Sequence, residues 1–186
     1  MSDRLLIYHC SPTLAGLKTG SMFSCMCDSL AEAEQAIAEW NRILEPKGLR
    51  TIILRFRNSR ALIYVYRYSH LMTDLMQPGV SEFLKECGYE NMKVEYMIQR
   101  LSDRIGNSEK FPHEIGLFLG YPLEDVKSFI ANCGRNSCMT GYWKVYNNLD
   151  EARKTFMRYT KCTNVYTQKM KEGTSLDRLT VRSRYA

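Results

Sequence analysis

The chain has 186 residues, of which 45% are hydrophobic and 25% are charged. This size and composition are typical of one domain with a sizeable core, and they exclude a disordered or fibrous protein. The longest apolar runs are far too short to cross a bilayer, and the first residues lack the basic-then-apolar pattern of a signal peptide. We therefore expect a cytoplasmic protein, where its seven cysteines would stay reduced.

The net charge of +6 is unevenly distributed along the chain. Over residues 153–186, nine lysines and arginines stand against Glu172 and Asp177 alone, which gives this segment a charge of +7 (nine minus two). A basic surface of this kind suits an acidic protein, a nucleic acid or an anionic membrane, but no nucleic-acid-binding motif accompanies it. The simpler interpretation is that these basic residues lie on a solvent-exposed helix face and on a flexible C-terminal end. We expect one α/β domain over 1–173 and a basic C-terminal tail over 174–186.

The best-defined helix is expected over residues 29–44. Ser29 and Glu32 form a capping box, in which each side chain satisfies a backbone amide at the helix start, and apolar residues follow at helical spacing. Two runs rich in β-branched and aromatic residues, 49–57 and 61–67, are predicted to be strands joined by a short turn. The second run is apolar on both faces, as in a strand that is covered from both sides.

Helical patterns dominate the remainder of the chain. The last predicted helix begins at Asn148, which we expect to cap it through its side chain. The sum is a single-domain α+β fold, in which several helices pack on a small mixed or antiparallel sheet that includes the hairpin near residues 49–67. The other predicted elements are a possible strand over 21–25, a broken helical stretch over 69–106, a helix over 122–132, a strand over 141–146 and the last helix over 148–172.

Three segments carry a resemblance to a known family: residues 9–23 (HCSPTLAGLKTGSMF), residues 111–129, and residues 138–146 (CMTGYWKVY). Together they resemble a family of short cytosolic proteins from anaerobic Gram-positive bacteria that is known only as a domain of unknown function. The resemblance spans nearly the whole chain, and its middle segment is the specific one. It implies no established activity. Relatives encoded near iron-uptake and flavodoxin genes imply a context of iron or redox metabolism.

The first of these segments places a cysteine beside a histidine and near a lysine. A thiolate close to His9 and Lys18 would have a lowered pKa, which makes Cys10 a candidate nucleophile, redox thiol or soft-metal ligand. His9, Thr13 and Lys18 are candidate ligand-binding residues. Adjacent residues on a helix or strand point in different directions, so His9 would not activate Cys10 directly. Free cysteines are also among the most buried residues, so the simpler explanation of Cys10 is that it is part of the core.

The second segment contains His113 and Glu114 directly after a proline. A histidine and a carboxylate can act as general acid and base or supply metal ligands, so both residues join Cys10 as candidate catalytic residues. They lack the spacing that would place two histidines on one helical face. The alternative is a helix start, where the helix dipole favours Glu114 in the first turn.

The third segment offers Tyr142, Trp143 and Lys144 as candidate ligand-binding residues. Aromatic side chains near the strands would line a flat ligand such as a flavin or porphyrin, and Lys144 would meet its acidic groups. Aromatic residues are equally typical of a sheet surface covered by helices, which is the simpler explanation.

Metal binding is not indicated by the spacing of the cysteines. The two pairs closest in sequence are respectively too tight and slightly too loose for a structural zinc site. A metal site would have to be assembled by the fold, and its nature is unknown from the sequence. Such a site would draw on His9, Cys10, His113 and Cys138.

No complete catalytic motif accompanies these candidates, since the chain lacks both a phosphate-binding glycine loop and a nucleophile elbow. We therefore expect a non-catalytic accessory protein of iron or redox metabolism that holds a small ligand or metal, with no cofactor specified. One alternative is a small thiol-dependent enzyme that uses Cys10. A second is an adaptor that binds an acidic partner through its basic C-terminal region.

Overall fold

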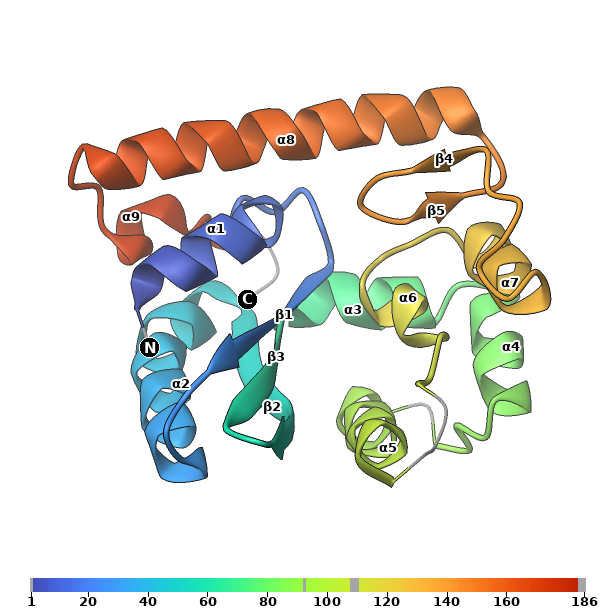
Figure 1. The fold of residues 1–186 in the computed structure, drawn as a ribbon, viewed down its shortest axis with the longest axis horizontal. Helices are drawn as coiled ribbons and strands as arrows, with labels where there is room; N and C mark the ends of the chain where they lie inside the picture. The colour runs from blue at the N-terminus through green and yellow to red at the C-terminus, as the bar shows by residue number, and fades with distance from the viewer. Residues whose placement is uncertain (1, 92, 108–110, 184–186) are drawn as a thin grey trace.

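The computed structural model describes residues 2–91, 93–107 and 111–183. A three-stranded antiparallel sheet lies at its centre, with helices on both faces (Figure 1). The predicted α+β class is confirmed, and the sheet is antiparallel rather than mixed. The spatial order of its strands is β1 (Gly20–Met26), β3 (Arg60–Arg67) and β2 (Leu49–Arg57).

The hairpin of β2 and β3 forms as predicted. Asn58 and Ser59 connect the strands with φ angles of 51° and 53°, the left-handed conformation that fits a two-residue hairpin turn to the twist of its strands. The pairing shifts by one residue between Ile53 and Arg55, where β2 carries a bulge. The possible strand over 21–25 also exists, as part of β1.

The central strand β3 sends alternate side chains into two separate cores. Ile63 and Val65 pack with α1 (Asp3–Leu14) and α2 (Leu30–Leu44). Tyr64 and Tyr66 point to the opposite face, and all four side chains are buried. The expectation of a strand covered on both faces is therefore confirmed. The second core is formed with α3 (Tyr68–Leu75), α4 (Val80–Glu86), α5 (Val94–Asn107), α6 (Ile115–Phe118) and α7 (Leu123–Ala131).

The predicted start of α2 is confirmed at atomic detail. The Ser29 hydroxyl accepts a hydrogen bond from the Glu32 amide at 3.1 Å. The Glu32 carboxylate in turn accepts from the amide of Asp28, at 2.7 Å. The helix ends in a short 3₁₀ turn (Glu45–Lys47), after which Gly48 adopts a φ of 81°. That left-handed conformation favours glycine and turns the chain into β2.

The strand predicted over residues 141–146 is wrong in part. Met139–Thr140 (β4) and Lys144–Val145 (β5) instead form a two-stranded hairpin, and the chain turns between them. A buried carboxylate explains this turn, because Asp125 accepts hydrogen bonds from the Trp143 indole at 2.7 Å and from the Tyr146 amide at 2.9 Å. The hairpin is thereby tied to α7.

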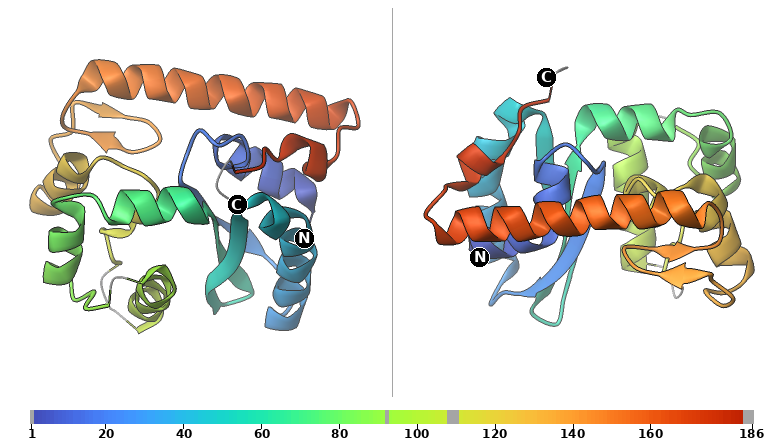
Figure 2. Two further views of the ribbon diagram at one scale, coloured as in Figure 1. Left: turned by 180° about the vertical axis from the view of Figure 1, so that it is seen from behind. Right: turned by 90° about the horizontal axis from the view of Figure 1, so that it is seen from above.

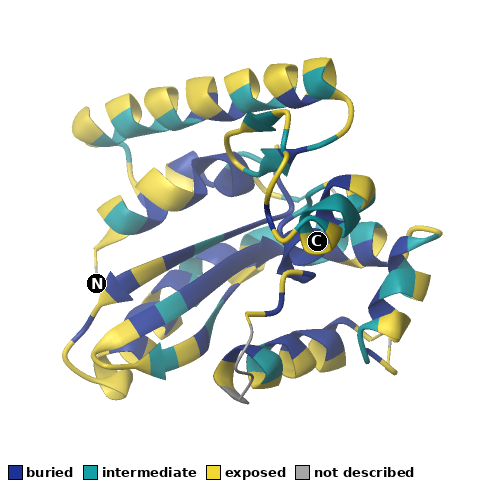
Figure 3. Cartoon of the chain, turned by 45° about the vertical axis from the view of Figure 1, so that its right-hand side comes forward, coloured by how far each residue is buried: buried dark blue, intermediate teal, exposed yellow. Residues whose placement is uncertain are grey.

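The long helix α8 (Leu149–Lys171) crosses the molecule from the β4–β5 hairpin to the far end of α1 (Figure 2). Its bounds agree with the prediction, but the cap does not. Asn148 has φ 48° and ψ 52° and makes no capping hydrogen bond through its side chain. Asparagine tolerates this left-handed conformation, so it ends the hairpin rather than capping the helix. The outward face of α8 is exposed, whereas its inner face is covered (Figure 3).

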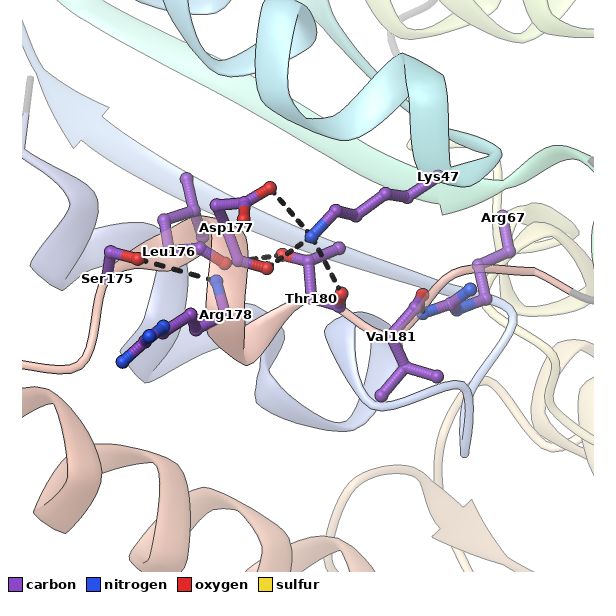
Figure 4. A network of polar contacts seen from close by, with 8 residues as sticks. All are labelled: Lys47, Arg67, Ser175, Leu176, Asp177, Arg178, Thr180 and Val181. Carbon is purple, nitrogen blue, oxygen red and sulfur yellow. Dashed lines mark hydrogen bonds and ion pairs between the residues drawn. The ribbon is translucent and has the colours of Figure 1, made fainter.

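The expectation of a loose C-terminal end is wrong for residues 174–183. Helix α9 (Leu176–Leu179) buries both of its leucines against α1 and α2. The Lys47 ammonium lies 2.7 Å from the Asp177 carboxylate and donates to the Thr180 carbonyl at 3.2 Å (Figure 4). The two buried leucines therefore fix this basic segment to the rest of the protein, which the net charge of the segment does not indicate.

Among the described residues, no helix is both long enough and apolar enough to span a lipid bilayer.

Candidate functional site

Two neighbouring cavities contain most of the sequence-predicted site residues. The first, here the lysine cavity, has a volume of about 400 Å³ and lies between α1, β1 and α8. The second, here the tryptophan cavity, has a volume of about 260 Å³ and lies between α7 and the β4–β5 hairpin. Tyr121 lines both. The lysine cavity is further defined by Tyr8, His9, Lys18, Tyr142 and Thr163, and the tryptophan cavity by His113, Phe129, Trp143 and Lys144.

The chain is folded tightly where it delivers Lys18 to the first cavity. Helix α1 contains Pro12, and the amides of Leu17 and Lys18 both donate to the Pro12 carbonyl, at 2.8 and 3.2 Å. Strand β1 then begins at Gly20, where an added Cβ would lie 2.7 Å from the Tyr64 ring. Only glycine fits this close approach. The Lys18 side chain is consequently held between the end of α1 and the start of β1.

Lys18 is buried, with 6% of its surface exposed. Its ammonium donates to the Gly20 carbonyl and lies 5.1 Å from the centre of the Tyr121 ring. Within the described part of the chain, no carboxylate forms an ion pair with it. Burial lowers the pKa of Lys18 to about 7, although the nearby Cys10 thiol opposes this change. Near neutral pH, this amine is therefore present in both its protonated and its neutral form.

Cys10 is fully buried and interacts with Lys18 and Ser21, which both line this cavity. Burial raises the pKa of its thiol, and the opposing effects of Lys18 and Ser21 are smaller. Thr13 is also buried, and its hydroxyl lies 2.8 Å from that of Ser21, which lines the lysine cavity. Cys10 is thus held as a protonated thiol that is shielded from solvent. Thr13 contacts the cavity residue Ser21 and does not line the cavity itself.

His9 faces the lysine cavity, as does Tyr142. The imidazole stacks on Phe23 at a centroid distance of 4.9 Å and an interplanar angle of 6°. Burial lowers the pKa of His9 below its usual value of 6.5, so the ring is neutral at pH 7. Tyr142 packs edge-on against Tyr159 of α8, at 5.1 Å.

His113 and Glu114, adjacent in sequence, serve different parts of the fold. The Glu114 carboxylate is buried in an ion pair with Arg104 of α5 at 2.7 Å and accepts a hydrogen bond from the Tyr89 hydroxyl at 3.1 Å. It therefore joins α5 to the start of α6. His113 instead faces the tryptophan cavity, where its ring packs edge-on against Phe129 at 4.9 Å. The structure does not bring Cys10, His113 and Glu114 together as one catalytic group.

The polar atoms of the tryptophan cavity are largely engaged by the protein itself. The Trp143 indole donates to Asp125, and the Lys144 ammonium donates to the Gly134 carbonyl at 2.6 Å. Trp143 also packs edge-on against Phe156 of α8, at 4.5 Å. The surface of this cavity that is left for a ligand is mainly aromatic and aliphatic. Trp143 and Lys144 consequently face a different cavity from their neighbour Tyr142.

Several cavity residues were missed by sequence reasoning. Tyr121 comes from the loop between α6 and α7, and burial raises its pKa to about 12, so that its hydroxyl stays protonated. Thr160, Thr163 and Asn164 come from α8, more than 130 residues away from His9 in the sequence. Their spacing on one helical face is the only local signal. It carries no information about which cavity that face lines.

A metal site assembled from the sequence-predicted ligands does not form among the described residues. No group of three or more histidine, cysteine, aspartate or glutamate side chains is placed there so that it could hold a metal ion. Cys138 is exposed next to β4, whereas Cys10 is fully buried. His9 and His113 face different cavities.

Comparisons with known proteins identify the family of the chain. No curated protein and no solved structure matches it. A family model described as "Protein of unknown function (DUF3793)" matches residues 6–180. That range contains both cavities and every residue that lines them. The chain therefore belongs to this family of proteins of unknown function.

Proposed function

We propose that this protein is a non-catalytic binding protein that holds a small, flat ligand in the lysine cavity, with an oxygen acceptor of the ligand facing Lys18. The buried lysine carries this proposal. Placing an ammonium group away from water and without a carboxylate partner costs several kcal/mol (roughly, by the general cost of burying an ion). An oxygen acceptor supplied by a ligand would offset that cost through a charge-assisted hydrogen bond.

The rest of the cavity supports a flat ligand with polar edges. Tyr8, Tyr121 and Tyr142, together with the neutral ring of His9, offer aromatic surfaces. Tyr8 and Tyr142 are 62% and 37% exposed, so this side of the cavity is open to solvent. A volume of about 400 Å³ lies in the range of small-molecule sites. The α8 side offers hydroxyl and amide groups for hydrogen bonds: Thr160, Thr163 and Asn164.

Two of the earlier expectations remain predictions beside this proposal. A role in iron or redox metabolism, and an origin in anaerobic Gram-positive bacteria, rest on the family resemblance.

The thiol-dependent alternative is disfavoured by the burial of Cys10 and the raised pKa of its thiol. The adaptor alternative is disfavoured by the docking of α9, which draws part of the basic segment onto the body of the protein.

Calorimetric titration with 4-hydroxybenzoate tests the proposal. The control ligand is 4-hydroxybenzyl alcohol, which is uncharged. We expect the carboxylate to bind wild-type protein and Lys18→Met to lose about 10- to 100-fold in affinity, because a hydrogen bond to a charged group is removed. Lys144→Met, in the other cavity, is the matched control and should bind normally. Equal affinity of wild type and Lys18→Met, or no binding to wild type, would contradict the proposal.

A further inference from the structure

Lys18 differs from Lys47, a partly buried lysine with a carboxylate partner. Lys47 lies 2.7 Å from the Asp177 carboxylate, which favours its protonated form. Lys18 has a backbone carbonyl and an aromatic face instead. A buried lysine in such surroundings releases its proton readily, which is how proteins make an amine nucleophilic. The structure thus places an amine with an available lone pair beside a cavity of ligand size.

The titratable groups around this amine do not restore its charge. Cys10 of α1 and Tyr121 of the loop before α7 both have pKa values raised by burial, so both are protonated and neutral at pH 7. His9, on the cavity wall, has a lowered pKa and is neutral as well. Tyr8 and Tyr142 complete the titratable side chains of the cavity. No carboxylate lines this cavity within the described residues.

We propose that the lysine cavity captures ligands that carry an aldehyde or ketone group, and that Lys18 binds them covalently as an imine. This inference rests on the proposed function, because it names the ligand class of the same cavity. It is carried by the burial of Lys18 at the cavity wall, by its lack of an ion-pair partner among the described residues, and by the aromatic side chains that would flank a flat carbonyl compound.

The reaction needs no further reagent. The neutral amine nitrogen of Lys18 adds to the carbonyl carbon, a C–N bond forms, and a proton passes from nitrogen to oxygen to give a carbinolamine. Loss of water then gives the C=N bond, so that amine and carbonyl compound yield imine and water without oxidation or reduction. A protonated imine keeps one N–H, which can still donate to the Gly20 carbonyl and keep its charge over the Tyr121 ring.

Reductive trapping tests this inference. Wild-type protein is incubated with 4-hydroxybenzaldehyde and sodium cyanoborohydride, which reduces imines to stable amines, and the modified lysines are identified by peptide mass spectrometry. At pH 7 we expect Lys18 to be modified at least about 10-fold faster than Lys47 or Lys144. The much larger neutral fraction of an amine with a pKa of about 7 outweighs its lower intrinsic nucleophilicity. The Lys18 rate should level off above pH 8, whereas the rates of the other lysines keep rising.

Two controls separate this inference from the proposed function. An excess of 4-hydroxybenzoate should slow the modification of Lys18 but not of Lys47, and Lys18→Arg should abolish the preferred modification while keeping a cation in the cavity. If 4-hydroxybenzoate binds in a Lys18-dependent way and Lys18 is modified no faster than Lys144, the imine is refuted and the binding site stands. If neither probe distinguishes Lys18, both proposals fail.

Discussion

Two buried basic side chains lie close to the end of α1 and are held in opposite ways. The Arg67 guanidinium, 1% exposed, donates to three backbone carbonyls: to Thr13 and Leu14, each at 2.6 Å, and to Val181 at 2.7 Å. The Lys18 ammonium, 6% exposed, donates to a single acceptor among the described residues, the Gly20 carbonyl. Arg67 lines neither of the two cavities described above, whereas Lys18 lines one.

This contrast separates a structural cation from one that is available to a ligand. Arginine cannot release its proton in a protein, and its planar group can satisfy several acceptors at once. Arg67 therefore fastens the end of α1 to β3. Through Val181 it also fastens the C-terminal segment (Figure 4). Lysine can release its proton when it is buried. Lys18 retains both unused hydrogen-bonding capacity and a titratable charge, which are the properties that a binding site needs.

The largest expected effect is the loss of the Arg67 contacts. Arg67→Met removes three charge-assisted hydrogen bonds, although the Thr13 and Leu14 carbonyls keep a backbone donor. We expect the free energy of unfolding to fall by about 3–5 kcal/mol. Urea denaturation monitored by circular dichroism measures the change. Arg57→Met, at an exposed position of β2, is the matched control and should stay within about 0.5 kcal/mol of wild type. A loss of less than about 1 kcal/mol in Arg67→Met would contradict the structural role of Arg67.

The matching change at Lys18 should have the opposite sign. Lys18→Met replaces a buried cation, which has no ion-pair partner in the described part of the chain, with an apolar side chain of similar length. We expect the free energy of unfolding at pH 7 to rise by about 1–4 kcal/mol. The same variant should bind 4-hydroxybenzoate poorly. Stability gained at the cost of binding is typical of functional positions. A destabilised Lys18→Met would instead mean that the ammonium contributes to the fold as Arg67 does.

Shortening the chain sharpens the account of Arg67. A chain that ends at Thr180 removes one of the three acceptors, the Val181 carbonyl, together with the hydrogen bond from the Val181 amide to the Leu14 carbonyl. We expect the free energy of unfolding to fall by about 1–2 kcal/mol, less than in Arg67→Met, because two acceptors remain. Thermal unfolding of the two variants and of the double variant gives their coupling. Fully additive losses would show that Arg67 and the C-terminal segment act independently.

The most gradual expected effect is a pH dependence that belongs to Lys18. Its pKa is about 7 in the folded protein and near 10.5 in the unfolded chain, so the unfolded state binds more protons between these values. Stability should therefore rise with pH in this window, by at most about 1.4 kcal/mol per pH unit. The advantage of Lys18→Met over wild type should be complete below pH 7 and shrink toward pH 10. Urea denaturation at pH 6, 7.5 and 9 tests this, and an unchanged difference would contradict it.

Local signals explain which parts of the fold could be predicted. The capping box at Ser29 and the alternation along β3 involve residues that are close in sequence, and both are found as predicted. Helix α1 was not predicted from the sequence. The spacing of its buried residues, Leu6, Cys10 and Leu14, is nonetheless helical and would have identified it. The β4–β5 turn depends on Asp125, which is remote in sequence and could not be inferred.

The residues of the candidate site were predictable in part, but their arrangement was not. His9, Lys18 and Tyr142 face one cavity, while His113, Trp143 and Lys144 face another. Which of these residues face which cavity depends on the positions of Tyr121 and of the inner face of α8, and tertiary packing sets both positions. The lowered pKa of Lys18 is likewise a consequence of burial, and burial of a lysine runs against its usual tendency. No pattern in the neighbouring residues indicates it.

The most direct test is a titration of Lys18 itself, followed by NMR on protein labelled with ¹³C and ¹⁵N in its lysines. The Lys18 signal is assigned as the one that disappears in Lys18→Arg. The account predicts that this side chain titrates near pH 7, well below the other lysines, and that 4-hydroxybenzoate moves its titration to higher pH because the anion favours the protonated amine. A Lys18 signal that titrates above about pH 10, as an ordinary lysine does, would contradict the central claim.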